Sequence, residues 1–422
     1  MHFNVQAPFA LTSRFNSQHK YIWIVWVCNM VRIRPNTLGN VWMLRQSERG
    51  IEYLSDQYRG RVFGYSEVNR KTLAQTSEIA LVTLAIGSSV NIQRQHDEYY
   101  NWHVIDHTLQ GGSPSYSAAS HAIINARKCD ETYAALNTHF AIDCAKPGTT
   151  EDYLKSNGEY YKSILQSIDD AKSNAGLFGK SLFVDCVKLS VLSGQTNLSS
   201  NSADYLIAAF VHELRADICA KTGQATFPKF LISPINDASS ELCIAEGELD
   251  INHPTLGIVV ASPQYWLEKE TLKQPTLTST AQVVLDEIQV LALREIQAGG
   301  TWFCPSMQRC HLGEDNTVRI EFSAMSDLVQ DGKGHLFKLS ENGAEIPIVK
   351  IEVDGKDVIL AFDASKGKPD QIRYAWGSDF TYDELTTAGK IRDSWECDSI
   401  VRPDLKLHRY ALSARKKILP WA

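Results

Sequence analysis

The chain has 422 residues, a formal net charge of −7, 44% hydrophobic residues and 22% charged residues. This length allows two or three domains, each with its own core, and the composition is ordinary for a globular protein. The acidic balance and the lack of dense basic runs in the sequence argue against a nucleic-acid partner.

The longest apolar stretch, residues 21–30, has about half the length that a membrane-spanning helix needs. It also lacks a small-residue cleavage site, so we expect neither a membrane span nor a signal peptide, but a buried strand or an assembly surface. The nine cysteines form no Cys-x-x-Cys pair, and no cofactor motif is present, so we expect no metal and no cofactor. Most thiols are expected to be buried and reduced, although Cys304 and Cys310 are close enough in sequence to form a bridge.

Residues 1–75 form a first region, a possible docking element, in which turns at 36–40 and 57–60 separate segments suited to short strands. Residues 76–300 alternate apolar strands with helical stretches, which predicts an α/β domain whose sheet is covered by helices. Its expected strands are 79–86, 102–106, 181–192, 227–234 and 257–262, and its expected helices are 152–174, 203–222 and 279–296.

The pattern changes after residues 297–300. Short alternating strands follow, and Asp354-Gly355 has the composition of a hairpin turn. These features predict a small antiparallel β domain over residues 301–422. Its expected strands are 318–322, 336–339, 346–353 and 358–362.

Polar or glycine-rich turns follow the apolar strands of the middle region. The strand 79–86 runs into Gly87-Ser88-Ser89, and a Gly111-Gly112-Ser113 turn comes next. The strand 181–192 runs into Ser193-Gly194-Gln195-Thr196-Asn197, and Gln274-Pro275-Thr276 precedes the last helix.

From about residue 78 to 415 these motifs resemble, in order and spacing, the sialate O-acetylesterase-like branch of the SGNH hydrolases, which act on acetylated carbohydrates. The resemblance implies an α/β/α three-layer domain with a C-terminal β appendage, to which residues 372–377 and 391–394 are similar. It places Ser89 at the nucleophile position and the backbone N–H of Gly112 in the oxyanion hole. Gln195 and Asn197 fall in the block that lines the ligand pocket.

The resemblance also locates the remaining catalytic positions. Residues 258–262 are similar to the strand that precedes the family's Asp-x-x-His loop, whose aspartate and histidine fall on Thr271 and Gln274. A glutamine amide cannot accept and return a proton near neutral pH, so it cannot replace the imidazole base. Loss of a triad member leaves only about 10³–10⁴-fold catalysis over water. The sequence therefore predicts a pocket that holds a sugar but cleaves it poorly.

Other histidines offer alternatives. The sequence Asp250-Ile-Asn-His253-Pro-Thr has the Asp-x-x-His spacing, which makes His253 a substitute base, although a strand and not the closing helix follows it. We interpret His212 as an ordinary helix-face residue. His96, His103 and His107 lack the pattern of a metal site.

The C-terminal region is rich in large aromatic side chains, which either stack on sugars or pack between domains. We favour packing for Trp376 and Tyr374 and leave Trp302, Trp395 and Trp421 open.

Three hypotheses follow for the function. The first is a carbohydrate-recognising structural protein with a degraded triad, such as a bacteriophage spike, fibre or tail component at a virion or cell surface, assembled with other chains or with copies of itself. The second is an active serine carbohydrate O-acetylesterase that uses Ser89 with His253 or another histidine. The third is a structural scaffold in which the pocket has collapsed.

Overall fold

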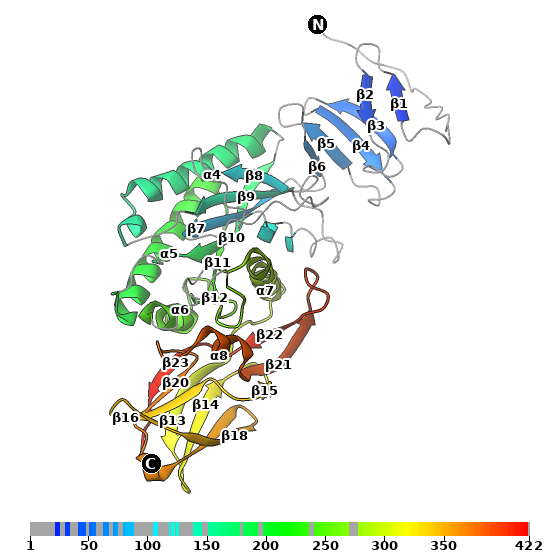
Figure 1. The fold of residues 1–422 in the computed structure, drawn as a ribbon. Coiled ribbons are helices and arrows are strands. Elements are labelled where there is room, and N and C mark those ends of the chain that lie inside the picture. Colours follow the sequence, from blue (N-terminus) through cyan, green and yellow to red (C-terminus); the bar gives the residue numbers. More distant parts are fainter. Residues whose placement is uncertain are drawn as a thin grey trace. The chain divides into compact units, whose positions relative to one another are not determined.

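A computed structural model of the chain describes residues 22–25, 30–33, 41–47, 50–55, 62–66, 71–74, 79–87, 104–108, 118, 120–122, 124–125, 138–145, 151–177, 180–192, 197–235, 240–269 and 277–420. The chain divides into two compact units, Met1–Thr76 and Ser77–Ala422 (Figure 1). The division into three domains with boundaries after residues 75 and 300 stays a prediction.

The first unit is built from antiparallel strands. The apolar stretch 21–30 contributes β1 (Ile22–Val25) and the first residue of β2 (Met30–Ile33), which pair with each other. A four-stranded meander follows, in the order β3-β4-β5-β6. Its strands are β3 (Val41–Ser47), β4 (Gly50–Ser55), β5 (Val62–Ser66) and β6 (Lys71–Ala74). The short strands expected in this region are confirmed.

A six-stranded parallel sheet forms the centre of the second unit, in the order β12-β11-β10-β7-β9-β8. Its central strands, β7 (Ile79–Gly87) and β10 (Ser181–Ser190), are apolar and buried along most of their length, because both faces of a parallel sheet are covered. The other strands are β8 (Val104–Thr108), β9 (Thr138–Ala145), β11 (Lys229–Ile232) and β12 (Ile258–Val260).

Helices cover both faces of this sheet (Figure 1). On one face lie α4 (Glu159–Leu177), α5 (Ser200–Thr222) and α6 (Glu241–Asn252). On the other face, α7 (Ser279–Gln297) buries an apolar stripe against side chains of β10, β11 and β12. This arrangement confirms the expected α/β fold with three layers. No helix in the described ranges is long and apolar enough to cross a membrane.

The helix expected at 152–174 is divided. A 3-10 turn, η2 (Glu151–Leu154), precedes α4, and Gly158 separates the two because glycine disfavours a helix interior.

Two elements of the sheet domain were not expected at all. The first is β9, in which polar His139 and Asp143 interrupt the apolar pattern. The second is α6, which is buried on most sides and therefore lacks the amphipathic period of a surface helix.

The C-terminal part of the chain folds into antiparallel sheets, as expected. The strand expected at 346–353 is two strands, because Pro347 cannot donate to a ladder. The hairpin at Asp354-Gly355 is confirmed, and Gly355 has a φ of 61°. The strands are β13 (Ser306–Leu312), β14 (Thr317–Ser323), β15 (Leu328–Asp331), β16 (Phe337–Glu341), β17 (Ala344–Ile346), β18 (Ile348–Asp354), β19 (Asp357–Phe362), β20 (Gln371–Tyr374), β21 (Lys390–Asp398), β22 (Lys406–Tyr410) and β23 (Ala414–Lys417), with a 3-10 turn, η3 (Ala364–Lys366), and a short helix, α8 (Tyr382–Thr387).

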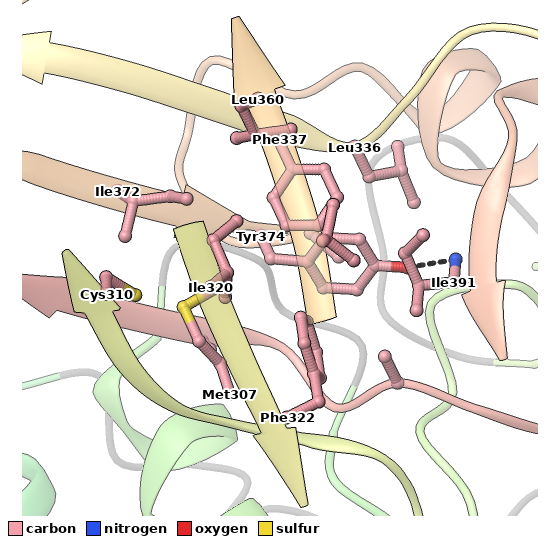
Figure 2. Close-up of a cluster of buried hydrophobic side chains, with 14 of the residues drawn as sticks. Met307, Cys310, Ile320, Phe322, Leu336, Phe337, Leu360, Ile372, Tyr374 and Ile391 are labelled. Atoms are coloured by element: carbon pink, nitrogen blue, oxygen red, sulfur yellow. Dashed lines mark hydrogen bonds between the residues drawn. The ribbon is translucent and has the colours of Figure 1, made fainter. Parts of the chain in front are cut away.

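Tyr374 lies in the middle of the core of these sheets (Figure 2). Its ring packs against Phe337, and its hydroxyl accepts a hydrogen bond from the Ile391 backbone N–H at 2.8 Å. The expectation that Tyr374 has a packing role is confirmed.

Cys310 belongs to the same core, whereas Cys304 packs with Val260 and Leu412, and both thiols are free.

The tryptophans join the β sheets to the α/β layers. Trp376 donates its indole N–H to the Ser240 carbonyl at the start of α6, as its packing role requires. Trp302 and Trp395 stack edge to face, with ring centroids 4.9 Å apart. Trp302 belongs to the hydrophobic cluster that α7 forms with β10, β11 and β12, and Trp395 packs against this cluster. Trp421 lies outside the described residues.

Candidate functional site at the carboxyl edge of the sheet

The carboxyl end of β7 comes unusually close to the end of β10. Gly87 has a φ of 96°, and a Cβ added to it would lie 1.8 Å from the Ser190 carbonyl oxygen. Only glycine fits this position, because a side chain would overlap the neighbouring backbone. The close contact therefore fixes the carboxyl end of β7 against that of β10, directly before Ser88 and Ser89 in the sequence.

A tyrosine braces this edge from the helical layer. The Tyr160 hydroxyl of α4 accepts a hydrogen bond from the Gly87 N–H at 3.1 Å and donates one to the Cys144 carbonyl at 2.6 Å. It thereby ties the ends of β7 and β9 together. Burial raises the pKa of Tyr160 well above its ordinary value, so the hydroxyl keeps its proton and its role as a donor.

Tyr160→Phe is expected to lower the free energy of unfolding by about 1–3 kcal/mol, because the Gly87 N–H and the Cys144 carbonyl both lose a partner in a buried place. Chemical denaturation of the full chain measures this change. Tyr205→Phe, on an exposed tyrosine of α5 that is 72% accessible, is the control. Equal stabilities of the two variants would refute the bracing role.

The end of β10 carries a strained residue. Leu192 is fully buried, yet it has a φ of 61°, a left-handed conformation that bulky side chains rarely adopt. In the sequence it directly precedes residue 193, the first of the block that the resemblance assigns to the ligand pocket. Backbone strain of this kind persists only where the surrounding structure holds it, and it gathers at functional sites. The conformation of Leu192 therefore supports a functional role for this edge.

A buried ion pair lies below the edge, between the sheet and α7. Lys188 of β10, two residues before the strand ends, donates to Asp286, which also accepts a hydrogen bond from Gln282 at 3.0 Å. Burial raises the pKa of Asp286, and the Lys188 charge opposes this shift. One helical turn further along α7, Gln289 donates to the Ser233 hydroxyl after β11 at 3.0 Å. The polar face of α7 thus fixes the ends of two neighbouring strands.

A buried glutamate holds the loop after β11. Glu246 of α6 accepts a hydrogen bond from the Ile235 N–H at 2.8 Å and is only 3% exposed. Burial raises the pKa of Glu246 from 4.5 to about 8. The protonated form is therefore favoured in the folded chain at neutral pH.

This pKa makes stability depend on pH. Because the folded state binds the proton more tightly than the unfolded state, the contribution of Glu246 is complete below pH 4.5 and is lost as the pH rises towards 8. Asp250, whose pKa burial raises from 3.8 to about 6, acts in the same direction at lower pH. We expect Glu246→Gln to remove most of the loss of stability between pH 6 and pH 8, at about 1.4 kcal/mol for each unit of pKa shift.

Denaturation midpoints measured from pH 5 to pH 9 check this expectation. Glu213→Gln, on an exposed glutamate of α5, serves as the control and should keep the pH dependence of the unaltered chain. The same slope in Glu246→Gln as in the unaltered chain would contradict it.

Most residues of the predicted site fall outside the described residues. These are Ser89, Gly112, Gln195, Thr271 and Gln274, together with His96 and His103, and of His107 only the backbone in β8 is described. Asn197 is exposed, two residues before Ser199, the N-cap of α5. The structure thus describes the strands and helices around the predicted pocket and one residue of its rim.

His253 lies apart from this edge. It follows the last residue of α6, and its Nε2 atom lies 2.7 Å from the Asp204 carboxylate of α5. His253 also precedes β12, so it lies towards the amino end of that strand. Gly87 is the last residue of β7 and therefore lies at the carboxyl edge of the same parallel sheet. The structure therefore places His253 in the helical layer. His212 is exposed beside Arg215, consistent with an ordinary helix-face residue.

Several residues of this edge were missed by sequence reasoning. Tyr160 gave no signal, because its partners are backbone atoms far away in the sequence. Lys188 did give a signal in the sequence, because it is a charged residue inside a largely apolar strand. In the described part of the chain, no three His, Cys, Asp or Glu side chains are grouped to hold a metal ion.

No protein-family model and no curated protein matches the chain. Among solved structures, it is similar to a carbohydrate acetylesterase from Xanthomonas citri, with a TM-score of 0.56 and 12% sequence identity over 92% of this chain and 88% of that chain. Two weaker similarities each cover 51% of this chain and 98% of the other: a protein from Arabidopsis thaliana, with a TM-score of 0.39 and 11% identity, and a carbohydrate acetylesterase from Sinorhizobium meliloti, with a TM-score of 0.29 and 12% identity. The first similarity establishes that the chain has the fold of a carbohydrate acetylesterase.

Proposed function

We propose that the chain recognises acetylated carbohydrate at the carboxyl edge of its sheet and hydrolyses the ester weakly or not at all. The fold shared with a carbohydrate acetylesterase supports the substrate class. Open parallel sheets bind ligands at the carboxyl ends of their strands, which supports the location.

The observation that carries this proposal is the position of His253. Ester hydrolysis by a serine needs an imidazole within hydrogen-bond reach of the hydroxyl. The sequence has Gln274 at the place of the expected base and offers His253, the histidine with the Asp-x-x-His spacing, or another histidine as the substitute. His253 is bonded to Asp204 in the helical layer and precedes the amino end of β12, whereas Ser89 follows the carboxyl end of β7 in the sequence, so we do not expect His253 to take its proton.

Two measurements test the proposal together. Purified chain is expected to bind acetylated bacterial polysaccharides on a glycan array and to release acetate from them, or from an aryl acetate, no faster than Ser89→Ala does. No binding to any glycan would refute the recognition. Rapid acetate release that Ser89→Ala abolishes would refute the weak catalysis and support the active O-acetylesterase instead.

We further propose that residues 1–75 act as a docking element within a larger assembly, such as a bacteriophage spike, fibre or tail. The support is that these residues form a compact unit of their own with antiparallel sheets. Light scattering of the full chain over a wide concentration range tests self-assembly, and a monomer at every concentration would leave only assembly with other chains.

A further inference from the structure

A cavity lies at the amino edge of the sheet, opposite the edge of the predicted site. It has a volume of about 550 Å³ and is lined by the first half of β10, Arg215 of α5, the segments before β11 and β12, and the last residue of α7. The wall residues include Phe183, Asp185, Arg215, Phe227, Lys229 and Gln297. A parallel sheet has no ordinary ligand site at this edge, so the cavity is separate from the site proposed above.

The sequence shapes β10 to reach this cavity. A β-bulge leaves Asp185 unpaired with β7, because Val184 pairs with Val82 and Cys186 pairs with Thr83. Bulges redirect side chains and are enriched beside functional sites. Gln224 supports the bulge, since its side chain accepts from the Val184 N–H at 2.8 Å and donates to the Val184 carbonyl at 3.2 Å.

The bulge places a carboxylate in the wall of the cavity. Asp185 is 6% exposed and is held by Asn125, at 3.3 Å, and by Gln297. Burial raises the pKa of Asp185, and the Arg294 charge and these hydrogen bonds oppose the shift. An oriented carboxyl group of this kind is a hydrogen-bond partner for hydroxyl groups.

Two cations and a partly exposed aromatic ring also line this cavity. The Arg215 guanidinium sits 4.6 Å from the centre of the Phe227 ring and donates to the Thr255 carbonyl at 2.7 Å, which fixes its position. Phe227 is 52% exposed, although a phenylalanine of this size is normally buried. Lys229, the first residue of β11, adds a second positive charge to the wall.

We propose that this cavity binds a uronic-acid residue of a glycan. The sugar hydroxyls meet Asp185, the apolar face of the sugar lies against the part of the Phe227 ring that Arg215 leaves exposed, and the sugar carboxylate pairs with Arg215 and Lys229. A ligand with only a negative charge would leave the carboxylate and the aromatic ring without a role, and a neutral sugar would leave the two cations unused. The inference stands whether or not the carboxyl edge binds acetylated carbohydrate.

Isothermal titration of the full chain with trigalacturonate tests the proposal, with neutral galactotriose as the matched ligand. We expect trigalacturonate to bind, and Phe227→Ala and Lys229→Met each to weaken binding about tenfold. Tyr205→Ala, at an exposed aromatic residue on α5 outside the cavity, is expected to bind as the unaltered chain does.

Three results would overturn the proposal: no binding of trigalacturonate, equal binding of galactotriose, or binding that persists in both cavity variants. The probe carries no acetyl group, so its binding reports on the cavity alone. A failure of the proposed function would instead appear with acetylated glycans and with Ser89→Ala.

Discussion

Thr271→Asp combined with Gln274→His is expected to raise the release of acetate from an aryl acetate at least about 100-fold. General acid–base catalysis by a positioned imidazole contributes about 10²–10⁴-fold, and the restored aspartate orients the ring and stabilises its charged form. Gln274→His alone should give a smaller gain, because its tautomer and orientation are not fixed. Initial rates near pH 8, with all variants at equal concentration, measure the effect.

Two controls make this result specific to the proposed layout. Ser89→Ala in the same background should remove the gain, since the new base then has no hydroxyl to activate. Gln308→His, on β13 in the C-terminal sheets, adds a histidine away from the site and should leave the rate unchanged. A folded double variant with no gain would show that residues 271 and 274 do not occupy the positions of the acid and the base.

Gly87→Ala is expected to cause the largest loss of stability of any single methyl group added at the site edge. The new Cβ would lie 1.8 Å from the Ser190 carbonyl oxygen, and the residue would also keep an unfavourable φ of 96°. Both strands belong to the centre of the sheet, so neither moves without breaking its ladder. We expect a loss of at least about 3 kcal/mol, or failure to fold.

Gly223→Ala separates the two causes. Gly223 ends α5 with a φ of 81°, but among the described residues no atom beyond its own chain neighbours lies within 4 Å of the place that the alanine methyl group would take. It should therefore lose only about 1–2 kcal/mol, the cost of a left-handed conformation for alanine. Denaturant midpoints of the two variants give the comparison, and similar losses would refute the close contact between β7 and β10.

Periodicity and composition predicted much of the fold. The apolar runs that became β7 and β10 are long and uninterrupted, because a parallel strand is buried on both faces. Helix α7 was predicted almost to its ends because Thr278 caps it and one of its faces is apolar. Two elements with weak local signals were not predicted: β9 contains polar residues whose burial depends on distant partners, and α6 is buried on most sides, with Glu246 among its buried residues.

The same distinction between local signals and distant contacts applies to the candidate site. The end of β7 at Gly87 was apparent from the sequence, because a glycine after an apolar strand marks its end. The bracing by Tyr160, the pairing of Lys188 with Asp286 and the raised pKa of Glu246 all depend on residues that lie far apart in the chain. No local pattern encodes such contacts.

The sequence by itself determined which chemical groups this protein possesses: a serine after a buried strand, a glutamine before the last helix of the sheet domain, and an Asp-x-x-His spacing ahead of β12. Only the tertiary structure decided where one of these groups points, since pairing with Asp204 places His253 in the helical layer. The physical reason is that residue identity is a local property, whereas the position of a side chain is set by packing between segments that are distant in the chain. The cavity at the amino edge has the same origin, because Asp185, Arg215 and Lys229 share no motif and meet only when β10, α5 and β11 pack together.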